Sequence, residues 1–216
     1  MSLAARVHVI VVNYQTPDLL DTAVRSFVEH YPDVPLLIVD NGSRDASRDV
    51  IETLHADLAN VSSLRLEENR YHGPAMDLAL RHVDVDYVFL LDSDTKTMRG
   101  GFLEEMLARS EEPNVYGVGK IAEVNERGFA ATRGIPVLVS AYMLIDRERY
   151  LDLPPFIHHG LPALQNFRAA AEAGYRLEPF PVDEYIEHFG RGTAERYGYG
   201  LGWKGRLDYL LNKLGF

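Results

Sequence analysis

The chain contains no cysteine among its 216 residues. This absence excludes disulfide bonds, thiolate nucleophiles and zinc sites with cysteine ligands, and it is typical of a cytoplasmic protein. Positive charge is also scarce, because 22 Lys and Arg residues stand against 32 Asp and Glu residues, for a formal net charge of -10. A negative surplus repels polyanions and argues against nucleic acid as a partner. A phosphorylated ligand would therefore need a local source of positive charge.

Long hydrophobic runs are absent as well. Apolar runs lie at residues 9–12, 36–39 and 88–91, and all are far shorter than the ~20 residues that span a bilayer. We therefore expect no membrane helix. The first run leads into Asn13 and Tyr14 without a small-residue cleavage site, so we expect a strand there and not a signal peptide. Hydrophobic residues still make up 46% of the chain, which suits one large domain with a substantial core.

What the sequence does contain is an alternation, over residues 7–95, of short apolar runs and segments with helical period. We expect strands at 7–12, 36–39, 64–66 and 86–91, with helices that begin at Pro17, near Val50 and at Gly73. Such alternation is typical of a parallel sheet with helices on both faces, which binds ligands at the carboxyl ends of its strands. After residue 98 we expect helices over 102–109 and 164–173, and strands over 115–124, 137–145 and 176–180.

Two aspartates, Asp92 and Asp94, stand at the end of the apolar run 87–91. Because a strand alternates its side chains between faces, residues i and i+2 point the same way and can converge on one ion. Oxygen ligands suit Mg²⁺ and Mn²⁺, which commonly share them with substrate phosphates. Aspartate is also a common turn and cap residue. The residues alone therefore leave two interpretations open, a metal-diphosphate site and a simple turn.

Several segments, read in order, carry a resemblance to a known family: 9–15, 37–45, 68–73, 90–94, 140–147 and 187–192. Together they resemble the nucleotide-sugar glycosyltransferases of the GT-A fold, and within them family 2. The resemblance covers nearly the whole chain. It implies an α/β fold of the GT-A, Rossmann-like type, with three layers and a mostly parallel mixed central sheet. It also implies one domain, with a donor half at 1–97, an acceptor half at 98–190 and a flexible basic C-terminal segment at 191–216.

The same resemblance implies a nucleotide site at the strand ends. Asp40 would hold the nucleobase, because a carboxylate that accepts from an imide N–H selects uracil or thymine. An Asx turn with Asn41 and Gly42 is the other interpretation of Asp40, and the two are compatible. The lack of a side chain at Gly73 would let the backbone approach the nucleotide, whereas His72 is interpreted as a loop residue. The nucleotide-binding residues that the resemblance implies are Asn13, Tyr14, Thr16, Asp40, Asn69, Gly73, Asp92 and Ser93.

For the metal, the resemblance implies that Asp94 is a direct ligand, that Asp92 acts through the ribose or a water, and that His188 completes the site. We expect Mn²⁺ or Mg²⁺, because a divalent cation neutralises the charge of a departing nucleoside diphosphate. A lone histidine is more often a surface or core residue. Its place before Phe189 and Gly190, however, is similar to that of the family's late histidine.

The chain departs from the family where the catalytic base is expected. Family members usually carry an acidic pair shortly before an Arg that here resembles Arg168, but no acid lies between Asp152 and Glu172. An inverting transferase needs a group that takes the proton of the acceptor hydroxyl. His159 is chemically competent, with an unperturbed pKa of ~6.5. The alternatives are that His158 and His159 are loop residues, that the base comes from elsewhere, or that the enzyme is a retaining one, which needs no such base.

The sequence thus predicts a metal-dependent glycosyltransferase that uses a UDP- or dTDP-sugar and an unidentified acceptor, either a saccharide, a glycolipid or a small molecule. A non-catalytic nucleotide-sugar-binding protein is the main alternative. A nucleotidylyltransferase and a nicotinamide-dependent enzyme are disfavoured, because the loop after the first strand has no glycine and no cation. The C-terminal segment would close over the donor, form a homodimer or touch a membrane surface. We expect a cytoplasmic protein, with contact to the membrane surface left open.

Overall fold

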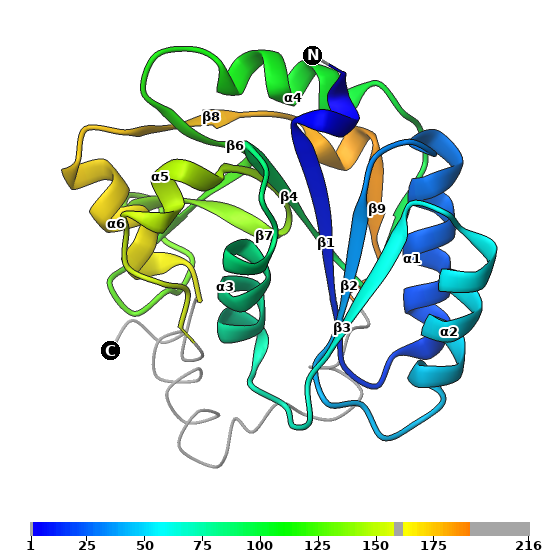
Figure 1. Cartoon of the computed structure of the whole chain (residues 1–216). Helices are drawn as coiled ribbons and strands as arrows, with labels where there is room; N and C mark the ends of the chain where they lie inside the picture. The colour runs from blue at the N-terminus through cyan, green and yellow to red at the C-terminus, as the bar shows by residue number, and fades with distance from the viewer. Residues whose placement is uncertain (1, 158–161, 191–216) are drawn as a thin grey trace.

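The computed structural model describes residues 2–157 and 162–190. Their middle layer is a seven-stranded sheet in the order β3-β2-β1-β4-β7-β6-β8 (Figure 1). A small second sheet pairs two further strands, β5 and β9. The strands are β1 (Val7–Asn13), β2 (Leu36–Asp40), β3 (Val61–Arg65), β4 (Tyr87–Asp92), β5 (Thr95–Thr97), β6 (Val115–Val124), β7 (Ile135–Asp146), β8 (Arg176–Pro179) and β9 (Ile186–His188).

The directions of the strands confirm the predicted mixed sheet. β3, β2, β1 and β4 are parallel neighbours. β7 then lies antiparallel to both β4 and β6, and β8 runs parallel to β6. The carboxyl ends of β1, β2, β3 and β4 therefore meet at one edge of the sheet, which for β1 to β3 is the lower edge in Figure 1.

Helices cover both faces of the sheet, as the alternating pattern predicts. One face carries α1 (Pro17–His30), α2 (Ser47–Asp57) and α4 (Phe102–Ser110), and the other carries α3 (His72–His82), α5 (Arg147–Leu151) and α6 (Leu164–Glu172). Two short 3-10 helices, η1 (Leu3–Ala5) and η2 (Val182–Glu184), complete the described elements. None of the described helices has both the length and the apolar character that crossing a bilayer requires.

The core follows from the period of each element. β1 sends Val9 and Val11 to the α1 face and Ile10 to the α3 face, so that one strand serves two hydrophobic clusters. α1 begins at Pro17, whose fixed φ suits the first helical position, and it buries an apolar stripe that includes Phe27. Full burial of such a side chain contributes about 1.5–3 kcal/mol. These contacts hold the strand ends, and hence the site, in place.

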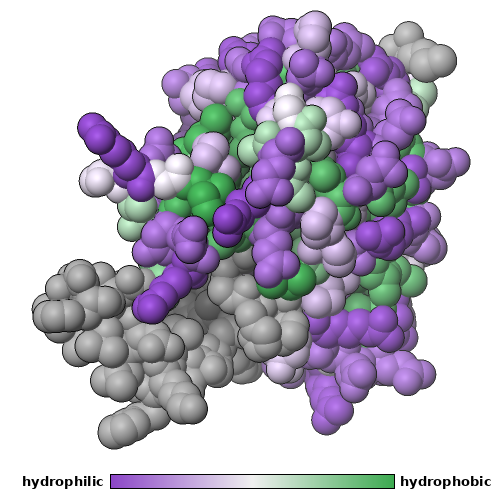
Figure 2. All heavy atoms as spheres, turned by 90° about the vertical axis from the view of Figure 1, so that its left-hand side faces the viewer, coloured by the Kyte–Doolittle hydropathy of each residue, from purple (hydrophilic) through white to green (hydrophobic). Residues whose placement is uncertain are grey.

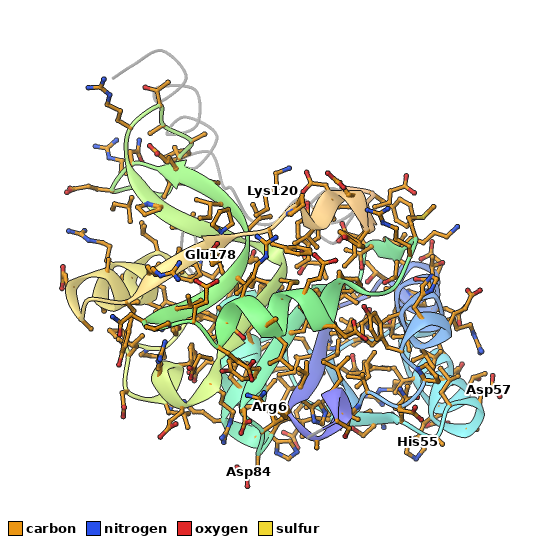
Figure 3. All side chains as sticks on the ribbon, turned by 90° about the horizontal axis from the view of Figure 1, so that it is seen from above. Arg6, His55, Asp57, Asp84, Lys120 and Glu178 are labelled. Atoms are coloured by element: carbon orange, nitrogen blue, oxygen red, sulfur yellow. The ribbon has the colours of Figure 1, made fainter. Side chains whose placement is uncertain are left out.

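Charged side chains lie around this core. Asp57, Asp84 and Lys120 lie at the periphery in Figure 3, and Figure 2 shows a face on which hydrophilic residues surround separate hydrophobic patches. Arg25 pairs with Asp57 at 2.7 Å and so links α1 to α2. Exposed pairs of this kind contribute about 0–1 kcal/mol each. The packing of the two clusters, and not surface charge, stabilises the architecture.

Most predicted elements are confirmed, and the differences are short or polar segments. β3 begins at Val61 and not at Leu64, because it pairs along the whole of β2. The apolar pattern missed its first residues because Ser62 and Ser63 are polar and exposed. The pattern did not predict β5, β9 or α5, which have three to five residues each. Segments of this length show no measurable period, so only pairing with distant strands reveals them.

Candidate functional site

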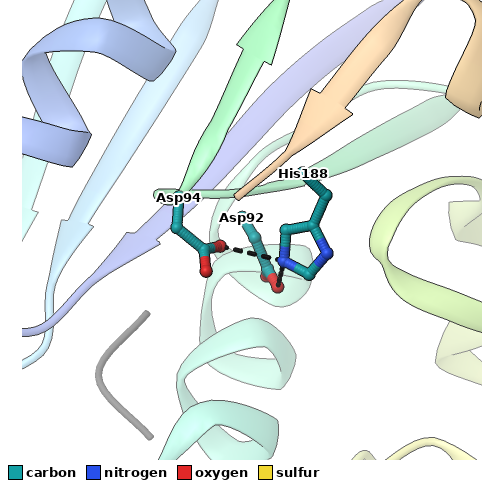
Figure 4. A group of neighbouring side chains, drawn as sticks. All are labelled: Asp92, Asp94 and His188. Carbon is teal, nitrogen blue, oxygen red and sulfur yellow. Dashed lines mark hydrogen bonds and ion pairs between the residues drawn. The ribbon is translucent and has the colours of Figure 1, made fainter. Parts of the chain in front are cut away.

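Three side chains with ligand atoms converge where β4 ends. β4 stops at Asp92, a turn of Ser93 and Asp94 follows, and β5 begins at Thr95. β9 runs antiparallel to β5 with His188 opposite Thr95, and this pairing brings the imidazole to the turn. Figure 4 shows the result: His188 Nε2 lies 3.1 Å from Asp94 Oδ1 and 4.0 Å from Asp92 Oδ2. One ligand atom from each residue lies within 4.8 Å of the others.

The two aspartates converge as predicted, but for a different reason. The prediction relied on strand alternation, in which residues i and i+2 share a face. In the structure the strand ends at Asp92 and the turn that contains Asp94 folds the second carboxylate back toward the first. The turn that the sequence left open is therefore present, and metal binding by the two aspartates stays a prediction.

The carboxylates and the imidazole of this cluster shift one another's pKa values. Burial raises the pKa of Asp92, and the nearby charge of Asp94 raises it further. The hydrogen bond with Asp94 raises the pKa of His188. A protonated imidazole and a divalent cation are thus alternative partners for the same carboxylate oxygens. Two carboxylate oxygens and one imidazole nitrogen are also a donor set that fits Mn²⁺, or Mg²⁺ with fewer protein ligands.

A second imidazole, that of His72, lies on the other side of Asp92. His72 is the first residue of α3, and its Nε2 lies 3.5 Å from Asp92 Oδ1. Its charge lowers the pKa of Asp92. The interpretation of His72 as a loop residue was therefore wrong, because the helix begins one residue earlier than the Gly-Pro pair indicates. The sequence signal that could have found it is its position at the carboxyl edge of a parallel sheet.

At the end of β2, Asp40 makes the predicted turn, and its role in holding a nucleobase stays a prediction. The residue is 1% exposed. Its Oδ1 accepts a hydrogen bond from the backbone N–H of Ser43 at 3.1 Å, which is the predicted turn. Its Oδ2 is buried and has no hydrogen-bond partner within the part of the chain that the structure describes. A buried oxygen without a donor is destabilising, so this atom is suited to accept an N–H from a ligand.

A chain of hydrogen bonds connects this turn to the end of β4. Ser93 Oγ and Thr16 Oγ1 are 3.1 Å apart, and Thr16 donates to Asn13 Oδ1 at 2.9 Å. Asn13 Nδ2 in turn donates to Ser43 Oγ at 3.3 Å. These four side chains are buried, so their hydrogen bonds position the strand ends relative to one another. Sequence reasoning missed Ser43, although it lies in the turn predicted after Asp40.

The other predicted nucleotide residues have mixed surroundings. Tyr14 is partly exposed in the turn that follows β1. The side-chain carbonyl oxygen of Asn69 accepts from Asn41 Nδ2, in the turn after β2, at 3.1 Å. A Cβ added at Gly73 would lie 1.9 Å from the carbonyl oxygen of Ile157, so the glycine lets the chain itself approach at this point. Their contacts with a nucleotide stay predictions.

The base candidate His159 and the C-terminal segment 191–216 lie outside the described residues. The Arg that the family comparison used as a marker, Arg168, is exposed on α6. The role of His159 therefore also stays a prediction.

Comparison with known proteins gives matches of three kinds. The family model of glycosyl transferase family 2 matches residues 8–173. TuaG of Bacillus subtilis (strain 168), named as a teichuronic acid biosynthesis glycosyltransferase, is 32% identical over 108 residues, which are 48% of this chain and 43% of TuaG. Two solved structures extend the comparison to the fold.

The mannosyltransferase PcManGT from Pyrobaculum calidifontis, in complex with GDP-Man and Mn²⁺, has a TM-score of 0.67 at 19% identity, over 82% of this chain and 55% of that one. TarS 1-349 of S. aureus, in complex with UDP-GlcNAc, has a TM-score of 0.63 at 19% identity, over 84% of this chain and 57% of that one. At these identities the likeness shows the fold alone. The chain spans about half the length of each of these relatives.

Proposed function

Because the chain belongs to glycosyl transferase family 2 and has the predicted GT-A fold, we propose that it is a metal-dependent glycosyltransferase. The donor is a nucleoside-diphosphate sugar of the UDP or dTDP type, and the cofactor is Mn²⁺ or Mg²⁺. The acceptor is a hydroxyl group on a saccharide, a glycolipid or a small molecule. Residues 1–97 bind the donor and residues 98–190 contribute the acceptor side.

The observation that carries this proposal is the cluster of Asp92, Asp94 and His188. The three residues would hold the cation, which as a Lewis acid would stabilise the charge of the departing diphosphate. In a chain with a net charge of -10, no general field attracts a polyphosphate. The cluster therefore explains how an acidic protein binds an anionic donor.

Asp40 supports the choice of nucleotide. Its unpartnered Oδ2 suits the imide N–H of uracil or thymine, and neither adenine nor cytosine offers an N–H at the equivalent ring nitrogen. Guanine does offer one, and PcManGT was solved with GDP-Man whereas TarS was solved with UDP-GlcNAc. Uracil or thymine is favoured here by the predicted role of Asp40, and guanine is the competing base to test.

For the transfer itself, we propose an inverting reaction in which His159 takes the proton of the acceptor hydroxyl as the new bond forms. The absence of an acid between Asp152 and Glu172 supports a histidine in this role. The same absence supports two competing proposals. A retaining transferase needs no base there, and a non-catalytic nucleotide-sugar-binding protein would keep the donor pocket and lose the base.

The test measures the release of nucleoside diphosphate by the full chain in Mn²⁺ with UDP-, dTDP- and GDP-sugars. We expect release from a UDP- or dTDP-sugar, loss of that release in EDTA, and its loss in Asp94→Asn. The matched control is Asp84→Asn, which removes the same charge from a fully exposed side chain just before β4, at the opposite end of the strand. Donor binding without release would support the binding protein, and no binding of any donor would contradict the proposal.

A further inference from the structure

The carboxylate of Asp92 lies between two imidazoles. Its Oδ2 lies 4.0 Å from Nε2 of His188, inside the cluster of three residues with ligand atoms (Figure 4). Its Oδ1 lies 3.5 Å from Nε2 of His72, which is not one of the three. Among the described residues, no other basic side chain lies within 4 Å of this carboxylate. The two oxygens of Asp92 therefore face different partners, one inside the cluster and one outside it.

Each of the three residues in the cluster has a contact that holds it. The ring of His188 packs edge-on against that of Tyr142 on β7, with the ring centroids 6.1 Å apart. Asp94 Oδ1 lies 3.1 Å from His188 Nε2. For Asp92 the corresponding contact is with His72. The last side-chain torsion of an aspartate has only a broad preference, so a partner for one oxygen is needed to fix which oxygen faces the cluster.

A strained residue places His72 at the start of α3. Tyr71, directly before it, has a φ of 67° and a ψ of 168°. A residue with a Cβ atom adopts this region only where the surrounding structure imposes it, and such strain gathers at functional sites. Here Asn41, the residue after β2, donates from Nδ2 to the carbonyl oxygen of Tyr71 at 3.3 Å. The strained turn therefore determines which side chain the helix presents first.

Contacts with the chain that follows α5 hold the first turn of α3 as well. A Cβ added at Gly73 would lie 1.9 Å from the carbonyl oxygen of Ile157 and 3.0 Å from Cβ of Pro162. The backbone N–H of Ile157 also donates to the carbonyl oxygen of Pro162 at 3.1 Å, so these two residues are joined where they meet the helix. The residue after His72 is thus packed tightly, and the direction of the imidazole toward Asp92 is imposed by the fold.

We propose that His72 is a positioning residue of the metal site, which holds Oδ1 of Asp92 and so turns Oδ2 toward the cation bound with Asp94 and His188. This inference rests on the proposed function, since it assigns a role within the same site. An imidazole with a proton on Nε2 can donate toward Oδ1 whether or not the ring is charged. Partners that orient a ligand raise metal affinity without touching the ion. Without this partner, repulsion between the two carboxylates favours rotation of Asp92 away from Asp94.

The experiment measures Mn²⁺ binding to the full chain by isothermal titration without nucleotide. Loss of a partner that orients a ligand typically weakens metal binding about 10- to 100-fold, so we expect the Kd for Mn²⁺ to rise about tenfold in His72→Ala. His72→Gln keeps an N–H near the position of Nε2 and should restore most of the affinity. The matched control is His82→Ala, which removes the same side chain from the opposite end of α3, where it is exposed, and it should bind as the wild type does.

Two further measurements separate positioning from the alternatives. Without metal, the unfolding temperature of His72→Ala should stay close to that of His72→Gln, because substitution of a partly exposed side chain changes stability little. Pulsed electron paramagnetic resonance of the bound Mn²⁺, at saturating metal, counts the coordinated imidazole nitrogens. We expect one in the wild type and in His72→Gln, and none in His188→Gln.

The outcomes that would overturn the inference are distinguishable. If the wild type binds no Mn²⁺, the metal dependence of the proposed function fails and the inference fails with it. If the wild type binds Mn²⁺ and His72→Ala binds it equally well, or His72→Gln binds as weakly as His72→Ala, the inference alone fails. Two coordinated imidazoles in the wild type would make His72 a ligand and not a positioning residue. Equal losses of affinity in His72→Ala and His82→Ala, or a lower unfolding temperature in His72→Ala than in His72→Gln, would show a general structural effect instead.

Discussion

The ends of β2 and β4 lie at the same edge of one sheet, and each presents a buried carboxylate, but they are built in opposite ways. At the end of β2, the backbone N–H of Ser43 donates to Asp40 Oδ1, and Asn41 Oδ1 accepts from the backbone N–H of Arg70. Among the described residues, the other oxygen of Asp40 has no hydrogen-bond partner. At the end of β4, Asp92 and Asp94 lie close together, with the imidazoles of His72 and His188 as their neighbours.

This difference teaches how the two regions bind. A turn whose backbone and side chains are hydrogen-bonded is rigid before any ligand arrives, so it is suited to recognise a shape. Two carboxylates that lie close enough to bind the same ion repel each other, so a cation stabilises them. We infer that the end of β2 contributes specificity and that the end of β4 contributes metal-dependent affinity.

The largest expected effect comes from disrupting the rigid turn after β2. Gly42 has a φ of +79°, and a Cβ there would lie 2.5 Å from the backbone carbon of Glu68. Gly42→Ala should therefore lower the free energy of unfolding by about 3 kcal/mol, through both strain and overlap. Chemical denaturation monitored by circular dichroism measures this change.

Gly101→Ala is the matched control for Gly42→Ala. Its φ is +88°, but a Cβ there meets nothing within 4 Å. This variant should lose only the strain component, about 1 kcal/mol. Equal losses in the two variants would show that the turn after β2 is not tightly packed against the loop after β3, and the comparison would fail on that side.

The next effect compares substitutions of Asp94 and of Asp40, each measured with and without the metal. Asp94→Asn should reduce the affinity for UDP in Mn²⁺ by about a hundredfold, ~2.7 kcal/mol, and should leave the weak binding in EDTA unchanged. Asp40→Asn should reduce the affinity by about tenfold whether Mn²⁺ is present or not, because it removes the acceptor for the base. Isothermal titration in both buffers gives the four values.

A metal-binding measurement without nucleotide checks the same contrast. Mn²⁺ should raise the unfolding temperature of the wild type and of Asp40→Asn but not that of Asp94→Asn, because a ligand that binds the native state stabilises it. If Asp40→Asn also lost this stabilisation, the two strand ends would not be independent, and the division into specificity and metal affinity would be wrong.

The smallest effect concerns the opposite end of β1, away from both carboxylates. Burial lowers the pKa of His8, and the charge of His82 lowers it further. The unfolded chain therefore binds more protons than the native state below the unfolded pKa of ~6.5. Stability that is present above pH ~6.5 should be lost as the pH falls toward the lower native pKa.

His8→Asn should flatten this acid-side loss, by about 1 kcal/mol or less between pH 7 and 5. Urea unfolding at several pH values measures it, with His30→Asn at the end of α1 as the control. A profile that stays as steep in His8→Asn as in the wild type would place the acid-sensitive groups elsewhere, with the carboxyl-edge cluster as the first candidate.

The sequence alone was sufficient for the elements that have a period or a cap. Pro17, the apolar stripe of α1 and the run that forms β4 predicted their elements closely, because each signal is local. The positions of Asp40, Asp92 and Asp94 followed from the rule that parallel strands present their carboxyl ends at one edge. The family resemblance was needed to add His188, which no local pattern distinguishes from a surface histidine.

What only the tertiary structure decided depends on contacts between residues far apart in the chain. His188 reaches Asp94, 94 residues earlier, through the pairing of two three-residue strands. His72 reaches Asp92 through the packing of α3, and Asn41 holds Tyr71 in a glycine-like conformation across two loops. A local sequence window carries no information on such partners, because their free energy arises from burial and hydrogen bonding after the sheet has assembled. The sequence therefore determined which chemical groups stand at the strand ends, and the fold determined which of them act together.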